Sequence, residues 1–212
     1  MILPLPNIRP LPTFSGDPSE NHCYADIDAA YDYLRNDLGV PARNIVLYGR
    51  SLGSGPSCYL ASKTAQLKSV DDSDGPVGGV ILHAPFLSVY RVVVDTGCTV
   101  YGDKFPNVDF APMIKSPVIL VHGRSDQIVP FHHSERLYNA LPPQCQAKPL
   151  FIDGMGHNNV HAEVRPMFVD RLSEFLATHI QPAGGSYGGP RRHLKGMGHG
   201  INQSSTARPQ IA

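Results

Sequence analysis

Short apolar runs alternate along the chain with stretches in which apolar residues recur every three or four positions. The runs cover residues 44–48, 77–83, 117–122 and 148–153 and are typical of buried strands, and the run at residues 44–48 predicts a strand buried on both faces. The helical spacing predicts helices over about residues 24–38, 51–65, 132–140 and 162–179. This alternation predicts an α/β fold, a mostly parallel sheet with helices on both faces.

The alternating pattern is confined to residues 19–181, which we interpret as one domain. Residues 1–18 are predicted to be a Pro-rich leader, because five prolines remove backbone donors and fix φ. Residues 182–212 are rich in Gly and Pro and poor in apolar residues, so they are predicted to be a disordered tail. Residues 85–115 interrupt the strand–helix rhythm and are predicted to form a cap.

Composition and charge mainly exclude classes of function. The 212 residues carry 18 basic and 18 acidic side chains, so no net charge draws the chain to nucleic acid or to an anionic membrane. The apolar runs are all shorter than the roughly 20 residues of a transmembrane helix. The four cysteines are widely scattered, which predicts free thiols in a reducing, cytoplasmic compartment.

A motif with chemical meaning lies where the first predicted strand meets a helix. Residues 49–53 read Gly-Arg-Ser-Leu-Gly, which matches G-x-S-x-G, the sharp turn that lifts a serine hydroxyl clear of the sheet edge. The two glycines relieve crowding there, and the N–H of Leu52 is the expected oxyanion donor. A helix N-cap is the competing interpretation of Ser51, but the preceding apolar strand favours a nucleophile.

Two further residues complete a candidate triad. A serine nucleophile needs a base, the base needs an orienting carboxylate, and this fold arranges them in the chain order Ser, Asp, His. Asp126 follows the third predicted strand and His157 follows the fourth. A turn-forming Asp126 and a surface-loop His157 are the alternatives, but the shared placement and order favour catalysis. His199 repeats the local sequence of His157 without a preceding strand, and we discount it.

Three segments carry a resemblance to a known family. The helical Ala-Asp-Ile-Asp-Ala-Ala at residues 25–30, the Gly-Arg-Ser-Leu-Gly turn and the Gly-Met-Gly-His-Asn at residues 154–158 make residues 15–180 similar to the alpha/beta hydrolase domain-containing 17 proteins. The resemblance implies an α/β-hydrolase fold with Ser51 as nucleophile, Asp126 as acid and His157 as base. It also implies thioester hydrolysis that removes palmitoyl groups from protein cysteines, without a metal or organic cofactor.

The sequence departs from the family pattern at its start. The family has several strands before the helix at Tyr24, and a His-Gly-Asn motif among them supplies a second oxyanion donor. We therefore expect a sheet without its N-terminal strands, in which the strand at Ile45 forms an exposed edge. Family members are held on membranes by an acylated, cysteine-rich N-terminus. Only Cys23 lies near the start here, so we expect a cytoplasmic protein with no visible anchor and at most a peripheral membrane association.

The sequence thus predicts a serine hydrolase of carboxylic esters or thioesters, acting on an acylated protein or a small ester and not on nucleic acid. A serine peptidase or a lysophospholipase fits the same triad. A catalytically inactive or truncated hydrolase-like protein that acts by binding is the alternative outside enzymes. Within the cap, Phe86, Leu87 and Tyr90 are predicted to line an acyl pocket, with ordinary core packing as the competing interpretation of each.

Overall fold

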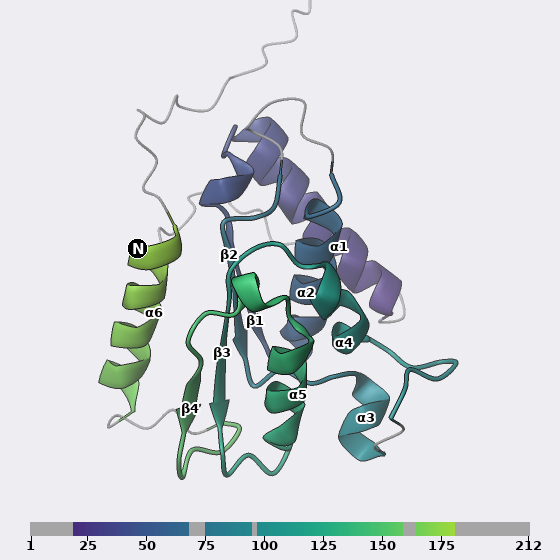
Figure 1. Ribbon diagram of the computed structural model, residues 1–212. Coiled ribbons are helices and arrows are strands. Elements are labelled where there is room, and N and C mark those ends of the chain that lie inside the picture. The colour runs from purple at the N-terminus through teal and green to yellow at the C-terminus, as the bar shows by residue number, and fades with distance from the viewer. Residues whose placement is uncertain (1–18, 68–74, 95–96, 159–163, 181–212) are drawn as a thin grey trace, which may run out of the picture.

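A computed structural model describes residues 19–67, 75–94, 97–158 and 164–180. The predicted leader and tail lie outside the described residues. Four strands form one parallel sheet, in which each strand pairs with the next along the chain (Figure 1). The strands are β1 (Val46–Arg50), β2 (Gly79–His83), β3 (Val118–Gly123) and β4 (Leu150–Ile152).

The helices are α1 (Glu20–Asp32), α2 (Ser54–Thr64), α3 (Val89–Val93), α4 (Asn107–Phe110), α5 (His132–Ala140) and α6 (Arg165–His179). Four of them, α1, α2, α5 and α6, follow the predicted pattern with shifts of a few residues at their ends, and α3 and α4 lie in the predicted cap segment, where no helix was predicted. A π-helical turn, Tyr33–Asp37, extends α1, and short 3-10 turns cover Ala42–Asn44, Ser51–Gly53, Ala111–Met113 and Pro143–Cys145. The predicted helix beginning at residue 51 therefore starts as a 3-10 turn and becomes α-helical only at Ser54.

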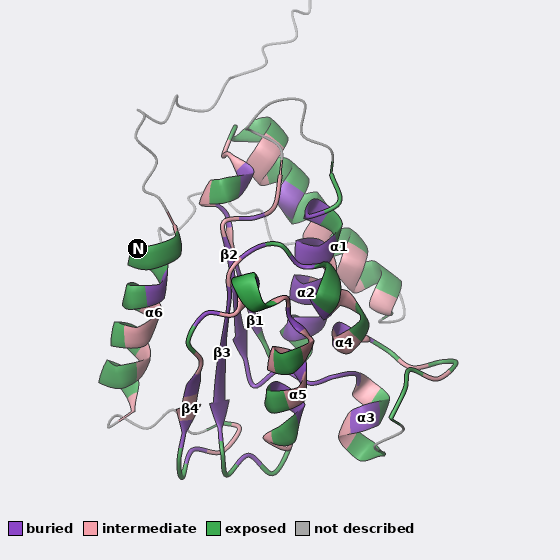
Figure 2. Ribbon diagram, viewed as in Figure 1, coloured by how far each residue is buried: buried purple, intermediate pink, exposed green. Residues whose placement is uncertain are grey.

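The sheet lies between two layers of helices (Figures 1 and 2), and alternate residues of the central strands pack against each layer. Leu82 and Leu120 lie in the larger core with Leu60 of α2 and Leu137 of α5. The intervening Ile81 and Ile119 pack on the opposite face against Phe175 of α6. Every residue of β2 and β3 is buried. The apolar runs within these strands thus have a direct cause, because each of their apolar residues packs in a core on one of the two faces of the sheet.

β1 is the exception to this two-sided burial. Among the described strands it pairs only with β2, so it forms an edge of the sheet, as expected. The apolar cluster under α6 reaches Val46 but not Tyr48, whose side chain is 50% exposed. Burial of this strand on both faces was therefore a wrong prediction, because within the described residues the layer of α6 does not extend over the outer end of β1.

The segment between β2 and β3 carries α3 and α4 and lies beside α1 and α2 (Figure 1). Phe105 stacks edge-on against Tyr24 of α1, and its backbone N–H donates to the Glu20 carboxylate. Its ring also fills the space where a Cβ at residue 55 of α2 would lie. This segment is therefore fixed to the body of the domain. In the described part of the chain, no helix is both long and apolar enough to cross a membrane.

Candidate active site

Ser51 lies between the end of β1 and the start of α2, on the 3-10 turn Ser51–Gly53. Its φ is 50°, a left-handed value that costs a residue with a Cβ roughly 1–2 kcal/mol. A Cβ on Gly49 would lie 2.5 Å from the carbonyl oxygen of Gly53 and from Ser57 Oγ, so glycine is required there. A Cβ on Gly53 would meet nothing within 4 Å. The expectation that both glycines relieve crowding is therefore right for Gly49 and wrong for Gly53.

A buried polar network fixes the backbone of this turn. Ser54 Oγ donates to the carbonyl oxygen of Ser51 at 2.7 Å. Asn107 Nδ2 in turn donates to Ser54 Oγ at 3.0 Å and to the carbonyl oxygen of Phe86 at 2.9 Å. Ser54 and Asn107 are both fully buried. Asn107 thus joins the turn to the segment between β2 and β3, a role that no local sequence signal indicates.

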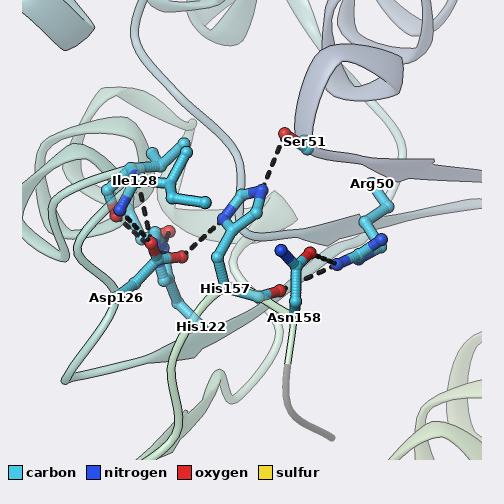
Figure 3. A network of polar contacts seen from close by, with 9 residues as sticks. Arg50, Ser51, His122, Asp126, Ile128, His157 and Asn158 are labelled. Carbon is cyan, nitrogen blue, oxygen red and sulfur yellow. Dashed lines mark hydrogen bonds and ion pairs between the residues drawn. The ribbon is translucent and has the colours of Figure 1, made fainter.

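Ser51, His157 and Asp126 form a continuous hydrogen-bonded chain (Figure 3). His157 Nε2 lies 3.0 Å from Ser51 Oγ, and His157 Nδ1 lies 2.7 Å from Asp126 Oδ2. An ionised carboxylate can only accept, so Nδ1 carries the ring proton in the neutral histidine. The lone pair of Nε2 then faces the hydroxyl of Ser51. The structure thus brings together the three side chains that the sequence singled out.

The carboxylate of Asp126 is held from both oxygens. Oδ1 accepts from the backbone N–H groups of Ile128 and Val129, both at 2.9 Å. Oδ2 accepts from His157 and from His122 Nε2, the latter at 3.2 Å. Burial by itself raises the pKa of Asp126, but the donors, led by the Val129 N–H and the His157 ring, outweigh it and lower this pKa. Asp126 is therefore ionised at neutral pH.

His122 supports this carboxylate from below the acid loop. Its Nε2 lies 3.0 Å from the carbonyl oxygen of Val129, which can only accept, so Nε2 carries the proton and donates to both Val129 and Asp126. Nδ1 then accepts from the hydroxyl of Ser134 at 2.6 Å. Burial lowers the pKa of His122, so the contact with Asp126 is a hydrogen bond of a neutral ring and not an ion pair. His122 thus fixes the acid loop through its hydrogen bonds to Asp126 and Val129.

The remaining predicted residues differ in their exposure. The side chain of Leu52 is 55% exposed beside Ser51. Leu87 is fully buried in the main core and Phe86 is 4% exposed, so both lie among packed side chains. Tyr90 is 45% exposed on α3. An acyl pocket formed by the last three stays a prediction. Next to His157 the surface has a shallow hollow of about 280 Å³, lined by Ser125, Gln127, Ile128, Gly156, His157 and Asn158.

Two polar groups that the sequence did not single out lie on neighbouring strands, one in the middle of β1 and one at the end of β2. Tyr48 Oη and His83 Nδ1 are 2.9 Å apart, which links the two strands through side chains. Burial, then the positive charge of Arg50, lowers the pKa of His83 to about 4. His83 is consequently neutral at pH 7. In the described ranges, no three His, Cys, Asp or Glu side chains gather as metal ligands do.

No family model matches the chain, but individual proteins do. Alpha/beta hydrolase domain-containing protein 17C of Mus musculus is 38% identical over 167 residues, which are 78% of this chain and 48% of that protein. Alpha/beta hydrolase domain-containing protein aho-3 of Caenorhabditis elegans is 34% identical over 163 residues, 76% of this chain and 45% of that protein. The chain therefore spans about half the length of the curated relatives it matches.

Solved structures share the fold at low sequence identity. The esterase domain of a Rhodothermus marinus protein has a TM-score of 0.55 at 17% identity, over 74% of this chain and 69% of its own. The monoacylglycerol lipase of Paleococcus ferrophilus has a TM-score of 0.54 at 19% identity, over 79% of both chains. An acylaminoacyl peptidase of Pyrococcus horikoshii has a TM-score of 0.56 at 14% identity, over 77% of this chain and 29% of its own.

The parallel sheet, the strained serine turn and these structural neighbours define the class, an α/β hydrolase. Within that class, the curated homologues are alpha/beta hydrolase domain-containing 17 proteins, to which this chain is similar over 78% of its own length. Both the fold class and the family resemblance predicted from the sequence are confirmed. The described sheet begins with β1, in agreement with the expectation that the N-terminal strands of the family are missing from it.

The two glycines of the serine turn make a matched pair of substitutions. Gly49→Ala should lower the free energy of unfolding by about 1–3 kcal/mol, because the added methyl group collides with backbone. Gly53→Ala should stay within about 1 kcal/mol of wild type, because its φ of −64° and its open surroundings accept a Cβ. Urea unfolding of both variants measures the difference, and equal losses would contradict the assigned crowding.

The low pKa of His83 makes stability depend on pH. A histidine whose pKa is lower in the folded than in the unfolded protein contributes stability above its unfolded value of 6.5, and this contribution is lost as the pH falls toward about 4. Between pH 7 and pH 5 the loss should approach about 2 kcal/mol. Urea unfolding at the two pH values should show a smaller loss in His83→Gln than in wild type.

The exposed His132→Gln variant controls for the removal of one histidine side chain. Because each variant is compared with itself at the two pH values, the cost of losing the Tyr48 contact cancels. Identical pH dependence in wild type and His83→Gln would refute the assigned burial effect.

Proposed function

We propose that this chain is a serine hydrolase that cleaves acyl esters or thioesters through Ser51, His157 and Asp126. The observation that carries the proposal is the hydrogen-bonded chain from Ser51 Oγ to His157 Nε2 at 3.0 Å and from His157 Nδ1 to Asp126 Oδ2 at 2.7 Å. The proposed nucleophile, Ser51, lies on a turn in which its own φ is 50°. Strain of this kind concentrates at functional positions, because a stable fold otherwise avoids it.

The proposed reaction is acyl transfer in two stages. His157 Nε2 takes the proton of Ser51 Oγ while that oxygen attacks the carbonyl carbon, and the Leu52 N–H stabilises the oxyanion. The imidazolium then gives its proton to the leaving alcohol or thiol, and the acyl group stays on Ser51. Water, deprotonated by His157, attacks the acyl-enzyme, and Ser51 recovers its proton as the acid leaves. Asp126 stays ionised and stabilises the imidazolium in both stages.

The choice of an ester or thioester substrate rests on family resemblance. The solved neighbours carry the names of an esterase, a lipase and a peptidase, and at 14–19% identity they share the fold and not a substrate. We infer from the resemblance to the alpha/beta hydrolase domain-containing 17 proteins that the substrate is an acylated protein and the reaction is depalmitoylation. In that reaction the leaving group is a cysteine thiol of the substrate protein.

Labelling with a fluorophosphonate probe tests the nucleophile. The wild-type chain should react, because the probe forms a covalent bond with a serine that has a working general base. Ser51→Ala should abolish labelling, and Asp126→Asn should lower its rate by about 10⁴-fold, because the wrong histidine tautomer then faces Ser51. Ser125→Ala, a serine in the acid loop, provides the matched control and should label like wild type. Wild-type protein that is folded and unlabelled would refute the proposal.

A substrate series tests the leaving group separately. Palmitoyl thioester, palmitoyl oxygen ester and peptide substrates are offered to protein that labels at Ser51. Faster turnover of the thioester than of the peptide, lost in Ser51→Ala, supports depalmitoylation. Faster turnover of the peptide instead would favour a serine peptidase and would leave the nucleophile assignment intact.

A further inference from the structure

We propose that Arg50 is a positioning residue that holds the loop of His157 against the nucleophile turn; this inference rests on the proposed function. Arg50 is the last residue of β1 and precedes Ser51. Its Nη2 donates to the carbonyl oxygen of His157 and to Asn158 Oδ1, each at 2.8 Å (Figure 3). The two hydrogens of one nitrogen thus bind two successive residues of the loop that carries the base.

The position of this loop needs such a contact because of the strand order. The base loop follows β4, whereas Ser51 follows β1, at the other side of the described sheet. The loop is well fixed on the side of the acid, where Ser125 N–H donates to the carbonyl oxygen of Met155 at 3.0 Å and Met155 is 2% exposed. These contacts fix the base relative to Asp126. They do not fix its distance from Ser51.

Among the described residues, side-chain contacts of two kinds join the serine turn to the base loop. One is the hydrogen bond between Ser51 Oγ and His157 Nε2, which belongs to the reaction itself. The other is the pair of bonds from Arg50. In the acyl-enzyme Ser51 Oγ carries the acyl group and no proton, so the first contact is lost. The bonds from Arg50 involve no reacting atom, and they persist while His157 activates water.

The chemistry of arginine suits this task. A guanidinium group is a permanently charged donor in proteins, and charge-assisted hydrogen bonds to a carbonyl or amide oxygen are stronger than neutral ones. Both Arg50 and Asn158 are exposed, so water competes for these bonds. The two hydrogen bonds from Arg50, here called the clamp, therefore position the loop more than they stabilise the fold. Small errors in the placement of a catalytic base are costly, since a displacement of about 1 Å lowers rates by roughly 100-fold.

The test compares Arg50→Met, Arg50→Lys and Asn158→Ala in the full chain with the fluorophosphonate probe and a simple ester. Arg50→Met should lower the labelling rate and kcat by about 10-fold or more while KM changes less than about twofold, because binding is untouched. Arg50→Lys retains a charged donor and should recover most of the lost kcat. The burst and the steady-state phases should both slow, because the clamp acts in acylation and in deacylation.

A double-mutant cycle identifies the contact. Asn158→Ala removes one of two acceptors and should lower kcat by about threefold, and combined with Arg50→Met it should add no further loss. Arg171→Met, an α6 arginine paired with Glu174 at 3.1 Å, removes the same charge elsewhere and is the control.

The outcomes separate this inference from the proposed function. Wild-type protein that labels at Ser51, together with Arg50→Met that labels at the same rate, overturns the role of Arg50 alone. Additive losses in the cycle, or a change confined to KM, also overturn it. Wild-type protein that does not label overturns the proposed function and the clamp with it.

Discussion

The hydrogen bond between Asp126 and His157 organises the rest of the site, because it joins the loop that follows β3 to the loop that follows β4. Asp126 has little freedom of its own: two backbone N–H groups hold one oxygen, and two imidazoles donate to the other. The ring of His157 takes its tautomer and its direction from that carboxylate. Ser51 then meets a lone pair and not an N–H. The buried charge of Asp126 therefore determines which atom donates and which accepts in both hydrogen bonds of the triad.

The serine turn meets the opposite requirement, because it has to stay strained. Its left-handed φ is unfavourable for any residue with a Cβ, and the surrounding structure must hold it. Ser54 and Asn107 do so from the interior, where a fully buried chain of hydrogen bonds ends on the carbonyl oxygen of Ser51. Gly49 provides the space that this close packing needs. A segment that the sequence presents as a cap therefore also supports the nucleophile from behind.

The parts of the fold that the sequence predicts well are those in which local pattern and burial coincide. Every residue of β2 and β3 is buried, and both strands contain an apolar run whose residues pack on the two faces of the sheet. The order of Ser51, Asp126 and His157 is likewise readable, because parallel strands bring their carboxyl ends to one edge. The exposure of Tyr48 was not predictable from its apolar neighbours, because it depends on how far the layer of α6 extends over β1.

The supporting residues escaped prediction for a common physical reason. Arg50 and His157 lie 107 residues apart in the sequence, and Asn107 and Ser54 lie 53 residues apart. Neither contact belongs to a sequence motif or to a periodic pattern of residues. Arg50 even occupies a position that the G-x-S-x-G pattern leaves open. Only the strand order shows that the base loop needs a second contact, on the side of β1, besides its contacts with the acid loop. β1 is an edge in the described sheet, so its terminal turn gains no support from a further strand there. The hydrogen bonds of Ser54 and Asn107, the contact between Tyr48 and His83, and the guanidinium of Arg50 provide that support instead.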